Sequence, residues 1–328
     1  MTPDSLPLIY FGKLPARGDF IRARHHINET NAIDQWVSQA LTAQSMRESS
    51  TTDISQKKLL TDSLVLNFSH VDTAANKIIT GVLLPSHDSS DRHYPLIGFS
   101  LIYLDKPKSW MNYLPIKSLS LWDHTYKALS MAKSQTDSDQ VSDMLNSYML
   151  PVDQHASTRY YDFINTTTLQ EVAQSMGIEK SQLIQQVIAT GLLFLPTFSK
   201  GFSGLNKTIC WTLTGDQTSA VLMATFWHDL IHSFYQPHQL YLNTYLYRNA
   251  DHYQLLLSFS KPDGHVLSEL TPLNDTDPED WVAIEDSAWT QSYIDEDIGL
   301  TRFHKILLQD DLYLYDTRQL FKKIFLAQ

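Results

Sequence analysis

The chain has 328 residues, 43% of them hydrophobic, so it is long enough for one large domain or two smaller ones with a real core. Its formal net charge of −11 makes nucleic acids and anionic lipid surfaces poor candidates as partners, because like charges repel. One cysteine excludes a disulfide within the chain, and no segment has 18 uninterrupted apolar residues, so we expect a cytoplasmic protein without membrane insertion.

The first predicted element is a strand at residues 8–11, followed at once by a loop with an unusual backbone path. Gly12, Pro15 and Gly18 interrupt the apolar pattern within seven residues. The loop carries three charged residues, Lys13, Arg17 and Asp19. The residues alone leave two interpretations open: these charges simply meet the solvent, or the loop presents them to a partner.

A helix is predicted from Asn28 or Thr30 to about residue 45, because its apolar residues repeat at helical spacing. Trp36 lies on the apolar face and is expected to be buried, while Asp34 lies early in the helix. Residues 47–58 are polar and indicate a loop or a weak helix. The following strands are predicted at 63–68, 78–84 and 96–104, and the polar loop at 85–93 carries Asp88 and Arg92.

Two further helices, around residues 119–129 and 141–149, complete the first half of the chain. This order predicts an α/β class protein whose N-terminal domain, residues 1–151, is a layered α/β/α sandwich with a mainly antiparallel sheet. A smaller α/β domain is predicted for residues 152–328.

In the second half, the capping box from Thr168 to Glu171 starts a helix that Gly177 ends. The other predicted elements are a helix at 180–190, strands at 208–213 and 219–225 joined in a hairpin by a Gly215-Asp216 turn, a short helix at 227–235, strands at 240–247 and 253–259, and a terminal helix at 317–326. Residues 274–297 form an acidic segment with aromatic residues, which suggests partial packing or a docking segment.

Two stretches resemble catalytic or ligand-binding motifs only in part. His228 and His232 have the helical spacing of a zinc motif, but Asp229 stands where the motif has Glu, and no third ligand stands out. Residues 201–208 come close to a phosphate-binding loop, but the second glycine is replaced by Asn206 and β-forming residues follow. Cys210 is expected to be a small buried hydrophobe. We therefore expect no enzyme activity, no cofactor and no metal.

Two ordered blocks of sequence carry a family resemblance. The first reads GKLPARGDF at residues 12–20 and is followed by Asp34 and Trp36; the second reads GVLLPSHD at 81–88 and continues as RHYPL at 92–96. Over about residues 8–130 the chain resembles the TagF (ImpM) family of accessory proteins of bacterial type VI secretion. The resemblance implies a post-translational repressor of secretion-system assembly or activation, acting through protein–protein interaction and linked to the forkhead-associated scaffold protein.

The candidate site consists of charged residues on the two loops and two residues of the first helix. Its members are Lys13, Arg17, Asp19, Asp34, Trp36, Asp88 and Arg92. Opposite charges placed in this way predict either a network that fixes the loops to the helix or a recognition surface for a partner. The alternatives for the whole protein are a structural accessory subunit of the secretion apparatus and a zinc-dependent hydrolase.

Overall fold

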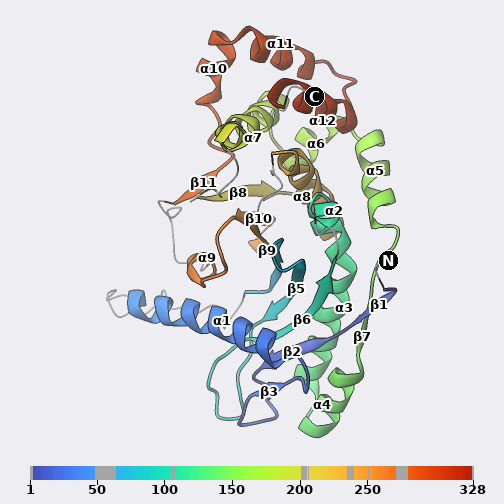
Figure 1. Ribbon diagram of the computed structural model, residues 1–328, viewed down its shortest axis with the longest axis vertical. Helices are drawn as coiled ribbons and strands as arrows, with labels where there is room; N and C mark the ends of the chain where they lie inside the picture. Colours follow the sequence, from blue (N-terminus) through green and yellow to red (C-terminus); the bar gives the residue numbers. More distant parts are fainter. Residues whose placement is uncertain are drawn as a thin grey trace.

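The computed structural model of the protein describes residues 3–48, 64–104, 108–200, 205, 207–234, 240–249, 251–270 and 280–326. Most strands join one sheet: β2 (Ile9–Gly12), β3 (Ile21–Arg22), β4 (Leu66–Asp72), β5 (Lys77–Leu84), β6 (Leu96–Tyr103), β8 (Thr208–Leu213), β9 (Tyr241–Asn249), β10 (His252–Ser258) and β11 (Trp281–Ala283). Their order is β11-β8-β10-β9-β4-β5-β6-β2-β3, and every pairing is antiparallel except the parallel one of β11 with β8 (Figure 1). Two more strands, β1 (Ser5–Pro7) and β7 (Met149–Pro151), pair separately.

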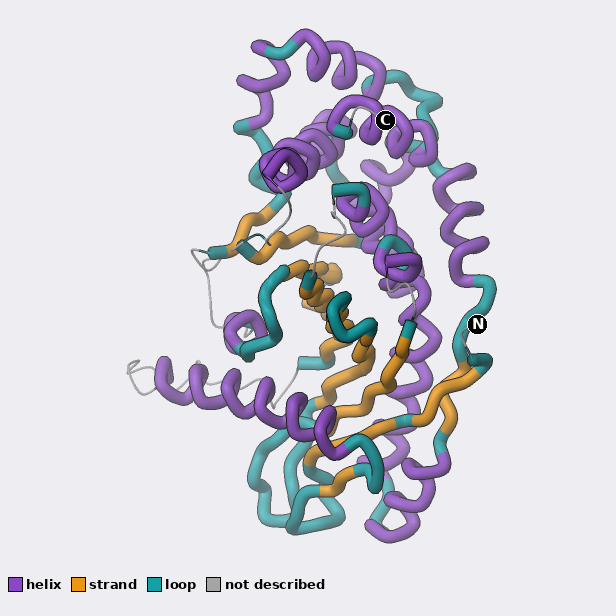
Figure 2. Tube along the Cα trace, viewed as in Figure 1, coloured by secondary structure: helices purple, strands orange, loops and turns teal. Residues whose placement is uncertain are grey.

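Helices cover both faces of the sheet, which confirms the predicted layered α/β class (Figure 2). One face packs against α1 (Ile27–Glu48) and α9 (His265–Glu269), and the other against α3 (Leu114–Ser134) and α8 (Gln217–His232). The remaining helices are α2 (Lys108–Met111), α4 (Ser138–Ser147), α5 (Ala156–Thr166), α6 (Leu169–Met176), α7 (Lys180–Lys200), α10 (Thr290–Glu296), α11 (Ile298–Leu307) and α12 (Leu314–Phe325).

Neighbouring residues of β4 show how the two faces are divided, since successive side chains of a strand point to opposite sides. Phe68 and His70 pack against Trp36 of α1, at ring-centre distances of 5.2 and 4.7 Å. Ser69, between them, hydrogen-bonds Thr80 of β5 at 2.7 Å and Ser118 of α3 at 3.3 Å. The sheet is therefore aromatic toward α1, while small hydrogen-bonded polar residues face α3.

The sheet continues across the predicted boundary at residue 151. Strand β9, from the second half, pairs with β4 from Leu66 opposite Tyr247 to Asp72 opposite Tyr241. The buried apolar residues of both halves likewise form one continuous cluster. The prediction of two domains, residues 1–151 and 152–328, did not foresee that strands from both would join one sheet.

The predicted hairpin after β8 is wrong, because residues 219–225 belong to helix α8. Gly215 takes a φ of +92°, and the carboxylate of Asp216 accepts a hydrogen bond from the Ser219 backbone N–H at 2.7 Å. Asp216 is thus a helix N-cap and not a hairpin turn residue. Helix α8 is buried on almost every side, so it lacks the polar stripe by which a surface helix is identified.

Other elements agree with the sequence more closely. Strands β2, β4, β5, β6, β9 and β10 lie within a few residues of their predicted positions, and the capping box at Thr168 is present in full. Met149 is an exception, since α4 ends at Ser147 and Met149 begins β7. The predicted features at 49–58, 201–204 and 274–279 lie outside the described residues. No described helix has both the length and the apolar character needed to span a membrane.

We predict that Trp36→Ala lowers the free energy of unfolding by about 3–5 kcal/mol, the usual cost of removing a large aromatic side chain from a core. Trp36 is 2% exposed and contacts three rings of the sheet, Phe68, His70 and Tyr245. Urea unfolding measures the loss. Trp289→Ala is the control, because Trp289 is 40% exposed; equal losses for the two variants would contradict the assignment of Trp36 to the core.

Candidate functional site

The candidate site is built from two loops that lie against each other. The first, residues 13–20, links β2 to β3, and the second, residues 85–95, links β5 to β6. Gly12, at the start of the first loop, has a φ of +139°, and a Cβ atom there would lie 2.2 Å from the carbonyl oxygen of Pro95. Glycine is therefore required both for the backbone conformation and for the close approach of the two loops.

A buried carboxylate joins the loops. Asp88 has no exposed surface, and its Oδ2 lies 2.9 Å from Nζ of Lys13 and 2.8 Å from Nε of Arg92. Its Oδ1 accepts hydrogen bonds from the backbone N–H groups of Ser90 and Arg92, at 2.9 and 3.0 Å. Burial alone would raise the pKa of Asp88, but these hydrogen bonds, led by that of Lys13, and the Arg92 charge hold the pKa well below its usual range.

The main chain of the first loop is also held by the second. The backbone N–H of Ser89 donates to the carbonyl of Arg17 at 3.0 Å, and Nη2 of Arg92 donates to the carbonyl of Gly18 at 2.6 Å. Nearer the strand, Oγ of Ser86 donates to the carbonyl of Lys13 at 2.8 Å. The turn at residues 17–18 is thus fixed through its carbonyl groups.

The side chains of Arg17 and Asp19 do not help to hold the two loops together. Both residues are exposed, and neither side chain has an ion pair or hydrogen bond with any residue that the structure describes. Of the charged residues predicted for the loops, Lys13, Asp88 and Arg92 therefore form the network that fixes them. Arg17 and Asp19 stand on the outside of the fixed turn.

An aromatic cluster, not anticipated from the sequence, lies beside this network. Phe20 stacks on Phe11 at 5.2 Å between ring centres and meets Tyr94 edge-on at 4.9 Å. Nζ of Lys13 lies 5.2 Å from the centre of the Phe20 ring, and Phe20 is 40% exposed. Phe20 lies in the first motif block and Tyr94 in the second. Their place in these blocks is the one feature of the sequence that could have drawn attention to them.

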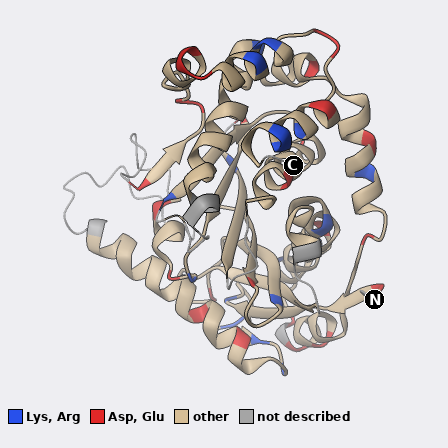
Figure 3. Ribbon diagram, turned by 45° about the horizontal axis from the view of Figure 1, so that its top comes forward, with Lys and Arg blue, Asp and Glu red and all other residues tan. Residues whose placement is uncertain are grey.

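Asp34 and Trp36 do not join the loop charges as predicted. Asp34 accepts a hydrogen bond from the Tyr94 hydroxyl at 2.6 Å, so it connects α1 to the second loop through a phenol and not through an ion pair. Burial and then the nearby Asp34 carboxylate raise the pKa of Tyr94, which keeps the phenol protonated. Trp36 points into the core against β4 and β9, away from the loops. Figure 3 shows acidic residues along α1.

The partial zinc motif on α8 has hydrogen-bond partners within the protein. His228 is fully buried, its Nδ1–H donates to the carbonyl of Met111 at 3.2 Å, and its Nε2 accepts from the Thr244 hydroxyl at 3.2 Å. Burial lowers the pKa of His228 to about 3, so the ring is neutral. Both ring nitrogens are therefore already engaged.

Asp229 also has a structural partner that the sequence did not reveal. Its carboxylate lies 2.5 Å from Nε of Arg318 on α12 and accepts a hydrogen bond from the Tyr160 hydroxyl at 2.9 Å. This buried ion pair holds the terminal helix against α8. Within the described part of the chain, no three His, Cys, Asp or Glu residues are grouped as a metal site requires. Thr208, at the end of the partial phosphate loop, starts a strand where the motif needs a helix.

We predict that Asp88→Asn lowers the melting temperature, because the buried Lys13 ammonium loses its charged partner. The low pKa of Asp88 means that its contribution is present above the unfolded-state value of about 3.9 and is lost as the pH falls below it. The difference between wild type and variant should therefore shrink below about pH 4. Asp19→Asn, an exposed change in the adjoining loop, is the control; a difference that persists at acid pH would contradict the charge network.

We predict that His228→Gln flattens the pH dependence of stability. The unfolded chain binds a proton at His228 below about pH 6.5, but the native ring does not, so the native state loses about 2 kcal/mol relative to the unfolded state between pH 7 and pH 5. The variant should lack this loss, as measured by urea unfolding at both pH values, with exposed His25→Gln as the control.

The same two proteins test the zinc alternative. We expect no stoichiometric zinc in wild type purified without chelator, since both nitrogens of His228 are engaged within the fold. One zinc per chain that disappears in the His228 variant would restore the hydrolase interpretation.

Comparison with known proteins finds a family model that matches part of the first half of the chain. Residues 9–148 match the TagF N-terminal domain, described as type VI secretion system-associated. Among solved structures, a crystal structure of PA0076 from Pseudomonas aeruginosa PAO1 is similar, with 19% identity and a TM-score of 0.35. That match covers 44% of this chain and 63% of the PA0076 chain. No curated protein matches the sequence. Both loops of the candidate site fall within residues 9–148, the part of the chain that matches the TagF N-terminal domain.

Proposed function

We propose that the protein is a cytoplasmic, post-translational repressor of type VI secretion that acts by binding another protein through the loop pair. The observation that carries the proposal is the arrangement at residues 17–19. The carbonyl groups of Arg17 and Gly18 are held by Ser89 and Arg92, while the side chains of Arg17 and Asp19 face the solvent. Charged side chains on a loop that is fixed by its own backbone form a preorganised surface, which lowers the entropy cost of binding.

The exposed edge of Phe20 adds an apolar contact beside the two charges. Phe20 is supported from below by Phe11 and Tyr94, so its position is set before any partner arrives. Aromatic and Arg residues are the types that contribute most to protein interfaces. Arg17, Asp19 and Phe20 together therefore have the composition of a small recognition surface.

The forkhead-associated scaffold protein of the secretion system is the partner that we propose. The family resemblance supports this choice, and the net charge of −11 favours a partner that presents a basic face. A non-enzymatic role is part of the same proposal. It is supported by the engagement of His228 and Asp229 within the fold, which leaves the partial zinc motif with structural tasks.

We predict that Arg17→Ala and Asp19→Ala each relieve repression without lowering the melting temperature, because neither side chain has a partner among the described residues. Effector protein in the medium, measured at equal levels of each variant in the producing cells, reports repression. A pull-down of the scaffold protein reports binding. Arg302→Ala, an exposed change on α11, is the matched control and should repress fully.

Two outcomes would contradict the proposal in different ways. Variants that melt like wild type and still repress fully would show that the loop is not the interface. Variants that lose repression only together with thermal stability would show that the loop serves the fold. Stoichiometric recovery of the protein within the assembled apparatus would favour the alternative of a structural accessory subunit.

A further inference from the structure

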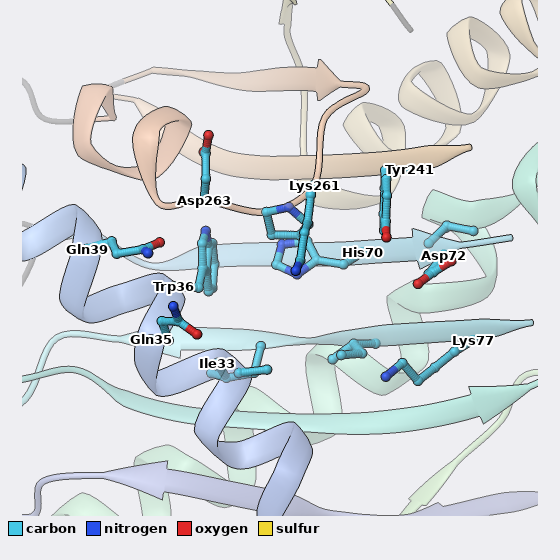
Figure 4. Close-up of a pocket in the computed structure, with 14 residues that line it drawn as sticks. Ile33, Gln35, Trp36, Gln39, His70, Asp72, Lys77, Tyr241, Lys261 and Asp263 are labelled. Atoms are coloured by element: carbon cyan, nitrogen blue, oxygen red, sulfur yellow. The ribbon is translucent and has the colours of Figure 1, made fainter. Parts of the chain in front are cut away.

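A cavity of about 440 Å³ lies on the α1 face of the sheet, away from the loop pair. Its walls come from α1, from strands β4, β5 and β9, and from the segment between β10 and α9. Figure 4 shows Trp36, His70 and Lys261 reaching this region from three different elements. The volume is within the range of about 300–1,000 Å³ that is usual for small-molecule sites.

The inner wall of the cavity is apolar. Ile33 and Trp36 line it from α1, and Val71 and Ile79 line it from the sheet. Gly264 holds the opposite wall in place: it has a φ of +78°, and a Cβ atom there would lie 2.6 Å from the carbonyl oxygen of Trp36. The segment before α9 is thus packed directly on α1, and the cavity between them has defined walls.

One buried polar atom in this wall has no partner. Nε2 of His70 is inaccessible to solvent and makes no hydrogen bond with any residue that the structure describes. Burial lowers the pKa of His70 to about 3, so the ring is neutral and Nε2 has an unused hydrogen-bonding position. Leaving such an atom unpaired in a core is costly.

The charged residues around the cavity are not equivalent. Asp72 Oδ1 accepts hydrogen bonds from the backbone N–H groups of Ala74 and Ala75, and Asp263 Oδ1 accepts one from the N–H of His265. Nζ of Lys77 lies 3.9 Å from Oε1 of Glu29, so these two side chains form an ion pair.

Lys261 differs from these residues. It is exposed and has no ion pair with the described residues, and Figure 4 shows its side chain extending toward β4 while the Asp263 carboxylate points the other way. Among the charged side chains that line this cavity, Lys261 is therefore the one with no hydrogen bond or ion pair to the described residues.

We propose that this cavity binds a small organic anion with an apolar body, such as an aromatic carboxylate or sulfonate. The apolar body lies against Ile33, Trp36 and Ile79, and the anionic group pairs with Lys261 at the opening. The proposal does not depend on the repressor function, because the cavity and the loop pair share no residue.

Two matched dyes test the proposal on the full-length protein. 1-Anilinonaphthalene-8-sulfonate has an apolar ring system and a sulfonate, and N-phenyl-1-naphthylamine has the same rings without the charge. Fluorescence titration should show saturable binding of the sulfonate at one molecule per chain. Lys261→Gln should weaken binding of the sulfonate by about tenfold and leave binding of the neutral dye unchanged. Lys323→Gln, an exposed change on α12 with the same loss of charge, is the control.

A second variant tests whether the dyes bind in this cavity. Ala32 lies exposed on α1 at the cavity wall, so Ala32→Phe adds a ring into the space without entering the core. It should weaken both dyes about tenfold or more while the melting temperature stays that of wild type.

Three results would overturn the proposal: no saturable sulfonate binding, undiminished binding by Ala32→Phe, or equal effects of Lys261→Gln on both dyes. The last of these would leave an apolar cavity without anion recognition.

Discussion

The pairing of β9 with β4 is the contact on which the rest of the structure depends. Strand β4 comes from the first half of the chain and β9 from the second, and together they place the two halves in one sheet. The pairing also brings Tyr245 beside Phe68, so that Trp36 packs against rings from both halves. Each half therefore supplies part of the core of the other. The loop pair depends on this arrangement indirectly, because β5 and β6, which hold one of the loops, continue the sheet from β4.

Local patterns predicted much of the fold, and the parts they missed depend on distant neighbours. The helical spacing around Trp36 identified its buried face, and the capping box at Thr168 identified a helix start, because both signals lie within a few residues. The shared sheet could not be predicted in this way, since strand pairing over more than 160 residues of sequence leaves no local trace. Helix α8 was missed for a related reason. A helix buried on all sides has the apolar, β-branched composition of a strand, and only the N-cap at Asp216 distinguishes the two.

In the candidate site, too, the residues with a local sequence pattern were predicted and those that depend on distant neighbours were not. Lys13, Asp88 and Arg92 were identified because opposite charges beside glycines form a recognisable pattern, and the structure brings the three together. The contribution of Phe20 and Tyr94 was not predictable, because an aromatic residue in a loop has no signature until its neighbours are known. His228 and Asp229 show the converse case. Their spacing resembles a metal motif, yet each has a partner from a distant element that gives it a structural task. Spacing along a helix fixes which residues share a face, but it does not fix what that face meets.

Helix α1 contributes to both the loop pair and the cavity. Trp36 forms a wall of the cavity, and two residues earlier Asp34 holds the Tyr94 hydroxyl, which supports the second loop and the Phe20 ring. Gly264 packs against the backbone of the same helix at Trp36 and Ala40, so α1 and the segment before α9 are in direct contact. A small displacement of α1 would therefore change the volume of the cavity and the length of the hydrogen bond between Asp34 and Tyr94 at the same time. The two regions share no residue, but α1 contributes to both of them, through Trp36 and through Asp34.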